Sequence, residues 1–250
     1  MLSQQKAKYI KSLQIKKYRM KHSRFLVEGA KNVQELLNSK FPVELMLVTE
    51  HFYYQNKPLI SATTSEIIIE NPTKIASVGT LKTNEAALAV VEIPVQEKLQ
   101  VGKDIVIALD DVRDPGNLGT IIRTADWYGI TTIVTSKETA DVYNAKVIQS
   151  SMGSFTRVKV YYEDLEQFFE NNPQIHVAGA VLDGGSVAEM KVEKPMVLFM
   201  GNESNGISEN LMKYIDQRIT IPKYGKAESL NVAMSTSIIC DNIMRIAASE

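Results

Sequence analysis

Residues 110–126 read DDVRDPGNLGTIIRTAD and place polar, chemically competent side chains where an apolar run ends and a helical pattern begins. An asparagine such as Asn117 can orient a polar partner, and the guanidinium of Arg123 can hold a phosphate or a developing alkoxide. Gly116 and Gly119 permit a tight turn. The stretch lacks both the G-x-G-x-x-G spacing and the lysine of a P-loop, so the pattern argues against a nucleotide-phosphate loop.

The helix that follows should pack by one face and leave Arg123 out of it. At 3.6 residues per turn, the apolar face consists of Leu118, Ile121, Ile122, Ala125 and Gly129. Arg123 is either a solvated surface residue or a functional one. Its position within two turns of the end of a strand keeps the functional interpretation open.

A second chemically suggestive loop is FMGNESNGIS, residues 199–208. A buried strand runs into Gly201, where the missing side chain lets a ligand approach the backbone closely. Glu203 is suited to orienting a polar partner or capping a following helix, whereas Ser204 and Asn205 are typical capping residues.

The third loop lies within ITIPKYGKAESLNVAMSTSII, residues 219–239. A strand, a loop and a helix are expected there, with Ser229 as the helix cap. Asn231 would then lie one step inside the helix, where asparagine is a poor helix former whose polar groups need partners. Small residues further along the helix favour close helix packing.

The elements that position these loops are indicated by apolar runs that alternate with helix-length segments. Such a rhythm is typical of a largely parallel sheet covered on both faces, and ligands of such sheets sit beyond the carboxyl ends of the strands. The runs are residues 104–110, 131–136, 156–162, 175–182, 196–201 and 218–223.

The first third of the chain mixes shorter signals and reads as a small, separate α/β unit. A helix is expected at 30–39, with extended runs at 25–29, 43–50, 67–70 and 86–94. We therefore predict one domain over residues 1–95, a linker over 96–103, and a larger domain over 104–250.

Composition narrows the possible partners. The 250 residues are 44% hydrophobic and 23% charged with a net charge of -1, as in ordinary globular proteins. The charge is uneven, because residues 1–27 carry eight Lys or Arg and no carboxylate. One cysteine and three scattered histidines predict no metal site, and no apolar run predicts a membrane span. The N-terminus lacks a secretory signal, so a cytoplasmic location is expected.

Taken together, the three loops resemble the three motifs of the SpoU (TrmH-like) RNA ribose methyltransferases of the SPOUT superfamily. The matching stretches are DPGNLGTIIRTAD, VLFMGNESNGIS and IPKYGKAESLNVAMSTSI, in family order. The N-terminal KYIKSLQIKKYRMKHSRFLVEGAKNVQELL is similar to the RNA substrate-binding domain attached to many of these enzymes. The resemblance therefore covers nearly the whole chain.

The resemblance implies an α/β fold whose C-terminal segment forms a deep trefoil knot that binds S-adenosylmethionine. By position, the cofactor pocket would be lined by Gly201, Ile221 and Leu230, with backbone groups around Met200, Ile221 and Leu230 reading the adenine. Family members are homodimers whose active sites are shared between subunits, so the resemblance also implies a homodimer.

The resemblance further implies a catalytic set for transfer of a methyl group to a ribose 2′-hydroxyl. The set is Asn117, Arg123, Glu203, Ser229 and Asn231. Arg123 is often proposed as the base in this family, yet a guanidinium is not normally deprotonated in proteins. Arg123 either becomes transiently neutral beside a cationic sulfonium, or stays charged and clamps phosphate and alkoxide; we prefer the clamp.

RNA affinity is expected from the basic N-terminal segment, since cations that neutralise phosphates release counterions. The expected RNA-binding residues are Lys11, Lys16, Lys17, Arg19 and Arg24. The interleaved Tyr9, Tyr18 and Phe25 would either stack on unpaired bases or belong to the core. Removing residues 1–95 should weaken RNA binding and leave cofactor binding intact.

Three other functions remain to be distinguished from an RNA ribose methyltransferase. A non-catalytic knotted RNA-binding protein would keep the fold without the reaction, and a base methyltransferase would modify a different atom. A nucleotide-dependent dehydrogenase would need the glycine fingerprint and the ribose-binding acid that this sequence lacks. Ribosomal RNA is the expected substrate, with transfer RNA second.

Overall fold

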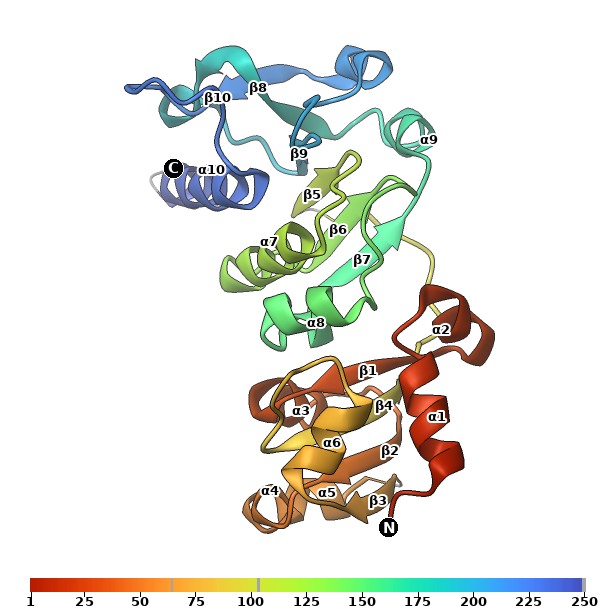
Figure 1. The fold of residues 1–250 in the computed structure, drawn as a ribbon. Helices are drawn as coiled ribbons and strands as arrows, with labels where there is room; N and C mark the ends of the chain where they lie inside the picture. Colours follow the sequence, from red (N-terminus) through yellow and green to blue (C-terminus); the bar gives the residue numbers. More distant parts are fainter. Residues whose placement is uncertain (64, 103, 249–250) are drawn as a thin grey trace. The chain divides into compact units, whose positions relative to one another are not determined.

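The computed structural model describes residues 1–63, 65–102 and 104–248, and it divides into two compact units (Figure 1). The first unit holds residues 1–97 and 141–156, and the second holds residues 98–140 and 157–250. The chain therefore passes between the units three times. Positions 103, 249 and 250 of the predicted linker and second domain lie outside the described residues.

The first unit is built on a four-stranded sheet of mixed direction. Its strands are β1 (Arg24–Glu28), β2 (Val43–Val48), β3 (Glu66–Ile69) and β4 (Ala87–Glu92), in the order β1-β4-β2-β3. β4 is antiparallel to both β1 and β2, and β2 is parallel to β3. The extended runs expected in the first third of the chain are thus confirmed as strands.

Helices cover both faces of this sheet because side chains alternate along each strand. On β1, Phe25 and Val27 face one cluster and Leu26 faces the other. Ile10 and Ile75 pack on the face of Leu26. The helices of the first stretch of this unit are α1 (Gln4–Ser12), α2 (Lys16–His22), α3 (Ala30–Leu37), α4 (Glu50–Gln55), α5 (Lys57–Ser61) and α6 (Pro72–Val78).

Residues 141–156 belong to the first unit, which differs from the predicted domain division. This segment forms α8 (Ala145–Ser151) and a short turn of 3₁₀ helix, η1 (Ser154–Thr156). Its Ile148 and Phe155 are buried in the same cluster as Phe25, and Tyr143 packs against that cluster. Burial of these apolar side chains explains the arrangement, because the face of β1 that carries Phe25 and Val27 would otherwise be partly open to water.

The second unit is built on a six-stranded sheet in which every recorded pairing among the described residues is parallel. Its order is β10-β8-β9-β5-β6-β7. The strands are β5 (Ile105–Leu109), β6 (Thr132–Thr135), β7 (Lys159–Tyr162), β8 (His176–Ser186), β9 (Met196–Met200) and β10 (Gln217–Thr220). The predicted parallel α/β sheet is confirmed, and each of the six apolar runs overlaps one of these strands.

Helices lie on both faces of the second sheet (Figure 1). One face packs against α9 (Leu165–Glu170) and the 3₁₀ helix η3 (Glu209–Tyr214), with Phe168, Phe199 and Leu211 in one cluster. The longest helices, α7 (Pro115–Trp127) and α10 (Val232–Ala247), pack together, and a further 3₁₀ turn, η2 (Val187–Glu189), follows β8. Among the described residues, no helix is both long enough and apolar enough to cross a membrane.

Small and polar side chains join α7 to α10. The hydroxyls of Thr124 and Ser237 lie 2.8 Å apart, and the Tyr128 hydroxyl donates to Asp241 over 3.4 Å. Cys240 is fully buried within α10, and burial raises the pKa of its thiol to about 12. The thiol therefore stays protonated at neutral pH and is a structural residue rather than a nucleophile.

Candidate active site

The start of α7 is fixed by local capping. Asp114 is the N-cap, and its carboxylate accepts from the backbone N–H of Asn117 over 2.9 Å. Pro115 occupies the first helical position, where its fixed φ suits a helix and its missing N–H costs no hydrogen bond. Asn117 is therefore held in the first turn of α7, beyond the loop 110–114 that follows the carboxyl end of β5.

The loop after β9 forms a tight turn that is closed by its own backbone. Asn202 and Gly206 exchange two backbone hydrogen bonds of 2.9 and 3.0 Å. A Cβ added to Gly201 would lie 2.1 Å from the carbonyl carbon of Gly206, so only glycine fits there. Gly201 thus permits close contact with the backbone of Gly206 in the same turn, rather than contact with a ligand.

Three predicted catalytic residues meet at the carboxyl edge of the second sheet. The amide nitrogen of Asn117 donates to Glu203 over 2.8 Å, and the amide nitrogen of Asn231 donates to the Asn117 oxygen over 2.9 Å. Glu203 therefore orients a polar partner, one of the two roles expected of it. Each of the three comes from a different loop, and Glu203 and Asn231 are separated from Asn117 by 86 and 114 residues.

Asn231, not Ser229, is the N-cap of α10. Its side-chain oxygen accepts from the N–H groups of Ala233 and Met234 at 3.0 and 3.3 Å. The prediction of a Ser229 cap was wrong because residues 229–231 are not helical and the helix begins only at Val232. Ser229 is exposed, and no hydrogen bond of its hydroxyl is recorded within the described part of the chain.

Arg123 is exposed on α7, away from the buried face made by Leu118, Ile122 and Ala125. Within the residues that the structure describes, its guanidinium has no recorded hydrogen bond or ion pair. Trp127, one turn further on, is 84% exposed. Gly129, expected on the buried face, instead follows the helix with a φ of +71°.

The residues expected to hold the cofactor flank two of the same loops. Met200 ends β9, Ile221 directly follows β10, and Leu230 precedes the cap of α10. Between them, residues 222–230 are all exposed and have no recorded hydrogen bond to the described chain. Backbone N–H and C=O groups without a recorded partner are thus concentrated in the segment that leads into Asn231, where a ligand can use them.

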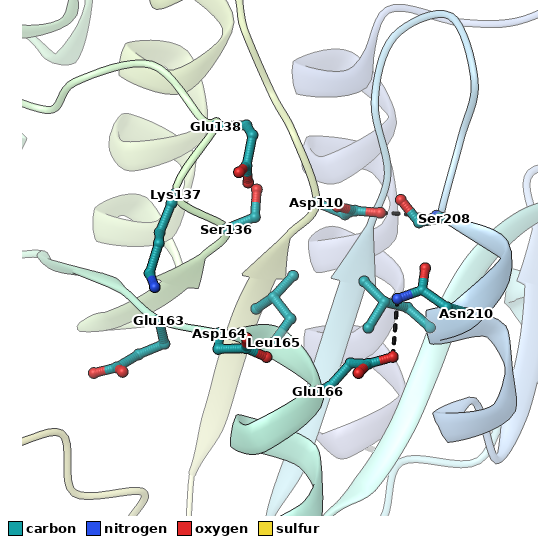
Figure 2. A pocket seen from close by; sticks show the side chains of 11 residues that line it. Asp110, Ser136, Lys137, Glu138, Glu163, Asp164, Leu165, Glu166, Ser208 and Asn210 are labelled. Atoms are coloured by element: carbon teal, nitrogen blue, oxygen red, sulfur yellow. Dashed lines mark hydrogen bonds between the residues drawn. The ribbon is translucent and has the colours of Figure 1, made fainter.

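A separate cleft of about 260 Å³ is lined in part by Asp110 (Figure 2). Figure 2 shows the Asp110–Ser208 and Glu166–Asn210 hydrogen bonds along one side of it. It is lined by five carboxylates and one ammonium, from Asp110, Glu138, Glu163, Asp164, Glu166 and Lys137. None of the predicted site residues lines it, and its carboxylates repel phosphates.

The predicted RNA-binding residues divide into exposed and engaged groups. Lys11, Lys16 and Lys17 are exposed on or beside α1 and α2. Arg19 is only 3% exposed and binds Asp141 over 2.6 Å, so it is not available to RNA. Arg24 bonds Glu44 and Glu92 at 2.6 and 2.8 Å and supports the sheet.

The interleaved aromatic residues also divide. Phe25 is fully buried and belongs to the core, whereas Tyr18 is exposed beside Lys17. Tyr9 packs against a core cluster and makes an edge contact with His22, and burial raises its pKa to about 12. Only Tyr18 retains an open face on which a base could stack.

Sequence reasoning missed two polar side chains that support the site, those of Asp110 and Asn202. Asp110 is 4% exposed and accepts from the Ser208 N–H over 2.8 Å, while the Asn202 side chain donates to the Asp111 carbonyl over 2.7 Å. A pair of aspartates directly after a buried strand was a usable signal, because such carboxylates need nearby donors.

Comparisons with known proteins find relatives of both parts of the chain. Residues 104–241 match the family model described as SpoU rRNA Methylase family, and residues 4–89 match an MRM3-like substrate binding domain. The chain is 33% identical over 238 residues to the 23S rRNA (guanosine(2553)-2'-O)-methyltransferase of Bacillus subtilis, covering 94% of each protein. It is 28% identical to the 23S rRNA (uridine(2479)-2'-O)-methyltransferase of Streptomyces viridochromogenes, covering 91% of this chain and 84% of that one.

Solved structures are similar over the whole chain. A TrmH-family RNA methyltransferase from Porphyromonas gingivalis has a TM-score of 0.85 at 33% identity, covering 98% of this chain and 99% of that one. An AdoMet-bound rRNA methyltransferase from Sinorhizobium meliloti has a TM-score of 0.88 at 28% identity, covering 98% and 97%.

Proposed function

This chain belongs to the SpoU rRNA methylase family, and we propose that it transfers a methyl group from S-adenosylmethionine to a ribose 2′-hydroxyl of RNA, with ribosomal RNA as the substrate. The observation that carries the proposal is the hydrogen-bonded cluster of Asn117, Glu203 and Asn231. It unites three loops at the carboxyl edge of a parallel sheet, where such sheets bind ligands.

The loops around this cluster fit S-adenosylmethionine in their donor chemistry. Residues 222–230 offer backbone N–H and C=O groups that no described residue engages, suited to the edge of an adenine. Met200, Gly201, Ile221 and Leu230 would hold the cofactor between the turn after β9 and this loop. When bound, S-adenosylmethionine supplies an electrophilic methyl group on a sulfonium.

The residues of the chain would position the ribose and balance charge. Arg123 keeps its positive charge and clamps a phosphate and the oxygen that develops negative charge. Glu203 holds the Asn117 amide and Asn117 holds the Asn231 amide, so the remaining N–H groups of both amides are already directed. Ser229 lies next in sequence to Leu230 and offers an uncommitted hydroxyl to the same site. Orientation of this kind can supply much of the rate enhancement of a displacement reaction.

A homodimer built around a C-terminal trefoil knot completes the proposal. β10 pairs with β8 at the edge of the sheet, and a Cβ on Gly184 would lie 2.6 Å from the Ile219 backbone, which supports tight threading there. Trp127 and Met234 are 84% and 58% exposed on α7 and α10. Large exposed apolar side chains on adjacent helices favour an interface, across which Arg123 would reach the cofactor of the other subunit.

The first unit would bind the RNA. Lys11, Lys16 and Lys17 are exposed beside Tyr18, and Ile15 and Met20 are 56% and 63% exposed on the same segment. Exposed lysines neutralise phosphates, and an open tyrosine ring can stack on an unpaired base. Arg19 and Arg24 are left out of this proposal because both are committed to carboxylates.

Mapping of 2′-O-methyl groups in total RNA, with and without the protein, tests the proposed function. A ribosomal RNA ribose should lose its methyl group without the protein and regain it when the wild-type chain, but not Arg123→Ala, is restored. Purified protein with labelled S-adenosylmethionine should reproduce the transfer.

The alternative functions give different results in the same experiment. Label on a transfer RNA ribose would identify transfer RNA as the substrate. Label on a base carbon or nitrogen would identify a base methyltransferase. Retained RNA binding without any transfer would point to the non-catalytic knotted protein.

A further inference from the structure

We propose that Asn202 is a positioning residue for the methyl transfer and acts through Glu203. This inference rests on the proposed function of the site. Asn202 itself is placed outside the Asn117–Glu203–Asn231 cluster, so its role is indirect.

The side chain of Asn202 builds the turn that presents Glu203. Its oxygen accepts from the N–H groups of Ser204 and Asn205 at 2.8 and 3.1 Å, and its backbone pairs with Gly206 in both directions. Glu203 is thus enclosed in a turn whose two ends and interior are hydrogen-bonded. This fixes the backbone from which the exposed Glu203 side chain extends.

The side-chain nitrogen of Asn202 joins that turn, through a hydrogen bond, to the loop leading into α7. The Asn202 nitrogen donates to the Asp111 carbonyl over 2.7 Å, and Asp111 adopts a φ of +55°. Asp111 lies three residues before the N-cap Asp114, so Asn202 sets the spacing between the two loops that carry Glu203 and Asn117. An alanine at position 202 would supply neither the acceptor that builds the turn nor the donor to Asp111.

The consequence is a continuous series of hydrogen bonds across the site. Asn231 donates to Asn117, Asn117 donates to Glu203, and the Asn202 nitrogen lies 3.5 Å from the second Glu203 oxygen. The Asp114 N–H also approaches Glu203 at 3.5 Å. An exposed glutamate would otherwise sample many rotamers, and holding it in one of them keeps the Asn117 amide directed.

Asn202→Asp separates this role from turn formation. The carboxylate keeps the acceptor that builds the turn, but it loses the donor to Asp111 and places negative charge beside Glu203. We expect the single-turnover methylation rate at saturating cofactor and RNA to fall by roughly tenfold or more, equivalent to about 1.4 kcal/mol. Asn205→Ala is the matched control, because the Asn205 side chain has no recorded hydrogen bond within the described residues.

The methylation rate of a double variant distinguishes a positioning role of Asn202 from a merely structural one. If Asn202 acts through Glu203, Asn202→Asp should cost little further rate in a Glu203→Ala background. Independent, multiplying losses would overturn the proposal, as would a loss confined to cofactor affinity with an unchanged rate at saturation. Thermal unfolding of every variant is measured in parallel, and Asn202→Ser replaces Asn202→Asp if the latter does not fold.

Failure of this inference and failure of the proposed function give different results. A wild-type protein that methylates no RNA would remove the proposed function itself. A wild-type protein that methylates RNA while Asn202→Asp and Asn202→Ser keep its full rate would remove only the role of Asn202.

Discussion

The guanidinium of Arg19 lies almost completely buried in the first unit. It donates to the carbonyls of Leu13 and Gln14 at 3.1 and 2.9 Å and pairs with Asp141, whose side chain is 14% exposed. Charged groups are tolerated in such sites only when they are paired and hydrogen-bonded. Arg19 therefore joins the turn between α1 and α2 to a segment more than a hundred residues away.

Replacement of Arg19 by Ala should destabilise the protein by about 3 kcal/mol, because it leaves Asp141 and two carbonyls without their donor. Chemical denaturation measures this change. Lys17→Ala, a loss of one exposed charge two residues away, should change stability by less than about 0.5 kcal/mol.

RNA titrations of the same two variants should give the opposite order. Lys17→Ala should weaken binding and reduce the salt slope by about 1, whereas a folded Arg19 variant should keep the wild-type slope. Equal loss of RNA affinity in both variants would contradict the assignment of Arg19 to the interior.

The density of basic residues predicted that the N-terminal segment exposes positive charge, but it did not predict which basic side chains are exposed and which are buried. Lys16 and Lys17 are exposed as expected, whereas Arg19 is on the buried side of the same helix. Its partner Asp141 is 122 residues away in sequence, and pairing over that separation leaves no local periodic signal. Arg24 was misleading for a similar reason, since its carboxylate partners Glu44 and Glu92 lie on two other strands, β2 and β4.

At the level of elements, the N-cap of α10 is Asn231, whose side chain makes two kinds of contact. The Asn231 oxygen caps the helix, and the Asn231 nitrogen holds Asn117. One side chain thus links the stability of a long helix to the geometry of the candidate active site. The two duties use different atoms, so substitutions can separate them.

Asn231→Asp should keep the stability of the protein and lose activity. Aspartate caps a helix about as well as asparagine, but it cannot donate to Asn117 and would place charge near Glu203. Asn231→Ala should lose activity and also about 1 kcal/mol of stability. Urea unfolding and single-turnover methylation of both variants check this, and equal stability losses would show that the cap is unimportant.

The strands were predictable from sequence, whereas the start of α10 was not. Apolar runs such as 104–110 and 196–201 mark β5 and β9 because a strand buried on both faces needs continuous apolar residues. Ser229 and Asn231 are both good capping residues, so local sequence does not choose between them. The structure shows Asn231 as the cap, and the same residue also contacts Asn117 on another helix.

At the level of the whole molecule, the first unit is incomplete without residues 141–156. Phe155 contacts Phe25 and Phe41 through ring centroids 6.1 and 5.8 Å apart, and a Cβ on Gly153 would collide with Glu35. Asn32 donates to Gln149 over 3.1 Å in the same region. The segment is therefore packed as a part of the core, and burial of its rings stabilises both α8 and the sheet.

A fragment of residues 1–97 should consequently be less stable than the same fragment joined by a flexible linker to residues 141–156. We expect the joined fragment to give a cooperative thermal transition and the shorter one to bind a hydrophobic dye. Circular dichroism and dye fluorescence measure the difference. Identical transitions for the two fragments would mean that the segment contributes nothing to the first unit.

The same reasoning modifies the expected effect of removing residues 1–95. That deletion would strip Ile148 and Phe155 of their partners and expose them. Cofactor binding by the second unit is best tested after residues 141–156 are also replaced by a Gly and Ser linker. The contribution of the first unit to RNA affinity can then be measured without aggregation.

The three passages of the chain between the units also constrain how the protein is synthesised. A ribosome releases the chain from its N-terminus, and domains generally fold as they emerge. Here the first unit cannot close its core when residue 97 appears, because Ile148 and Phe155 are still to be translated. Translation must deliver β5, α7 and β6 of the second unit before the first unit can finish folding, and the first unit can then close its core while β7–β10 of the second unit are still to be translated.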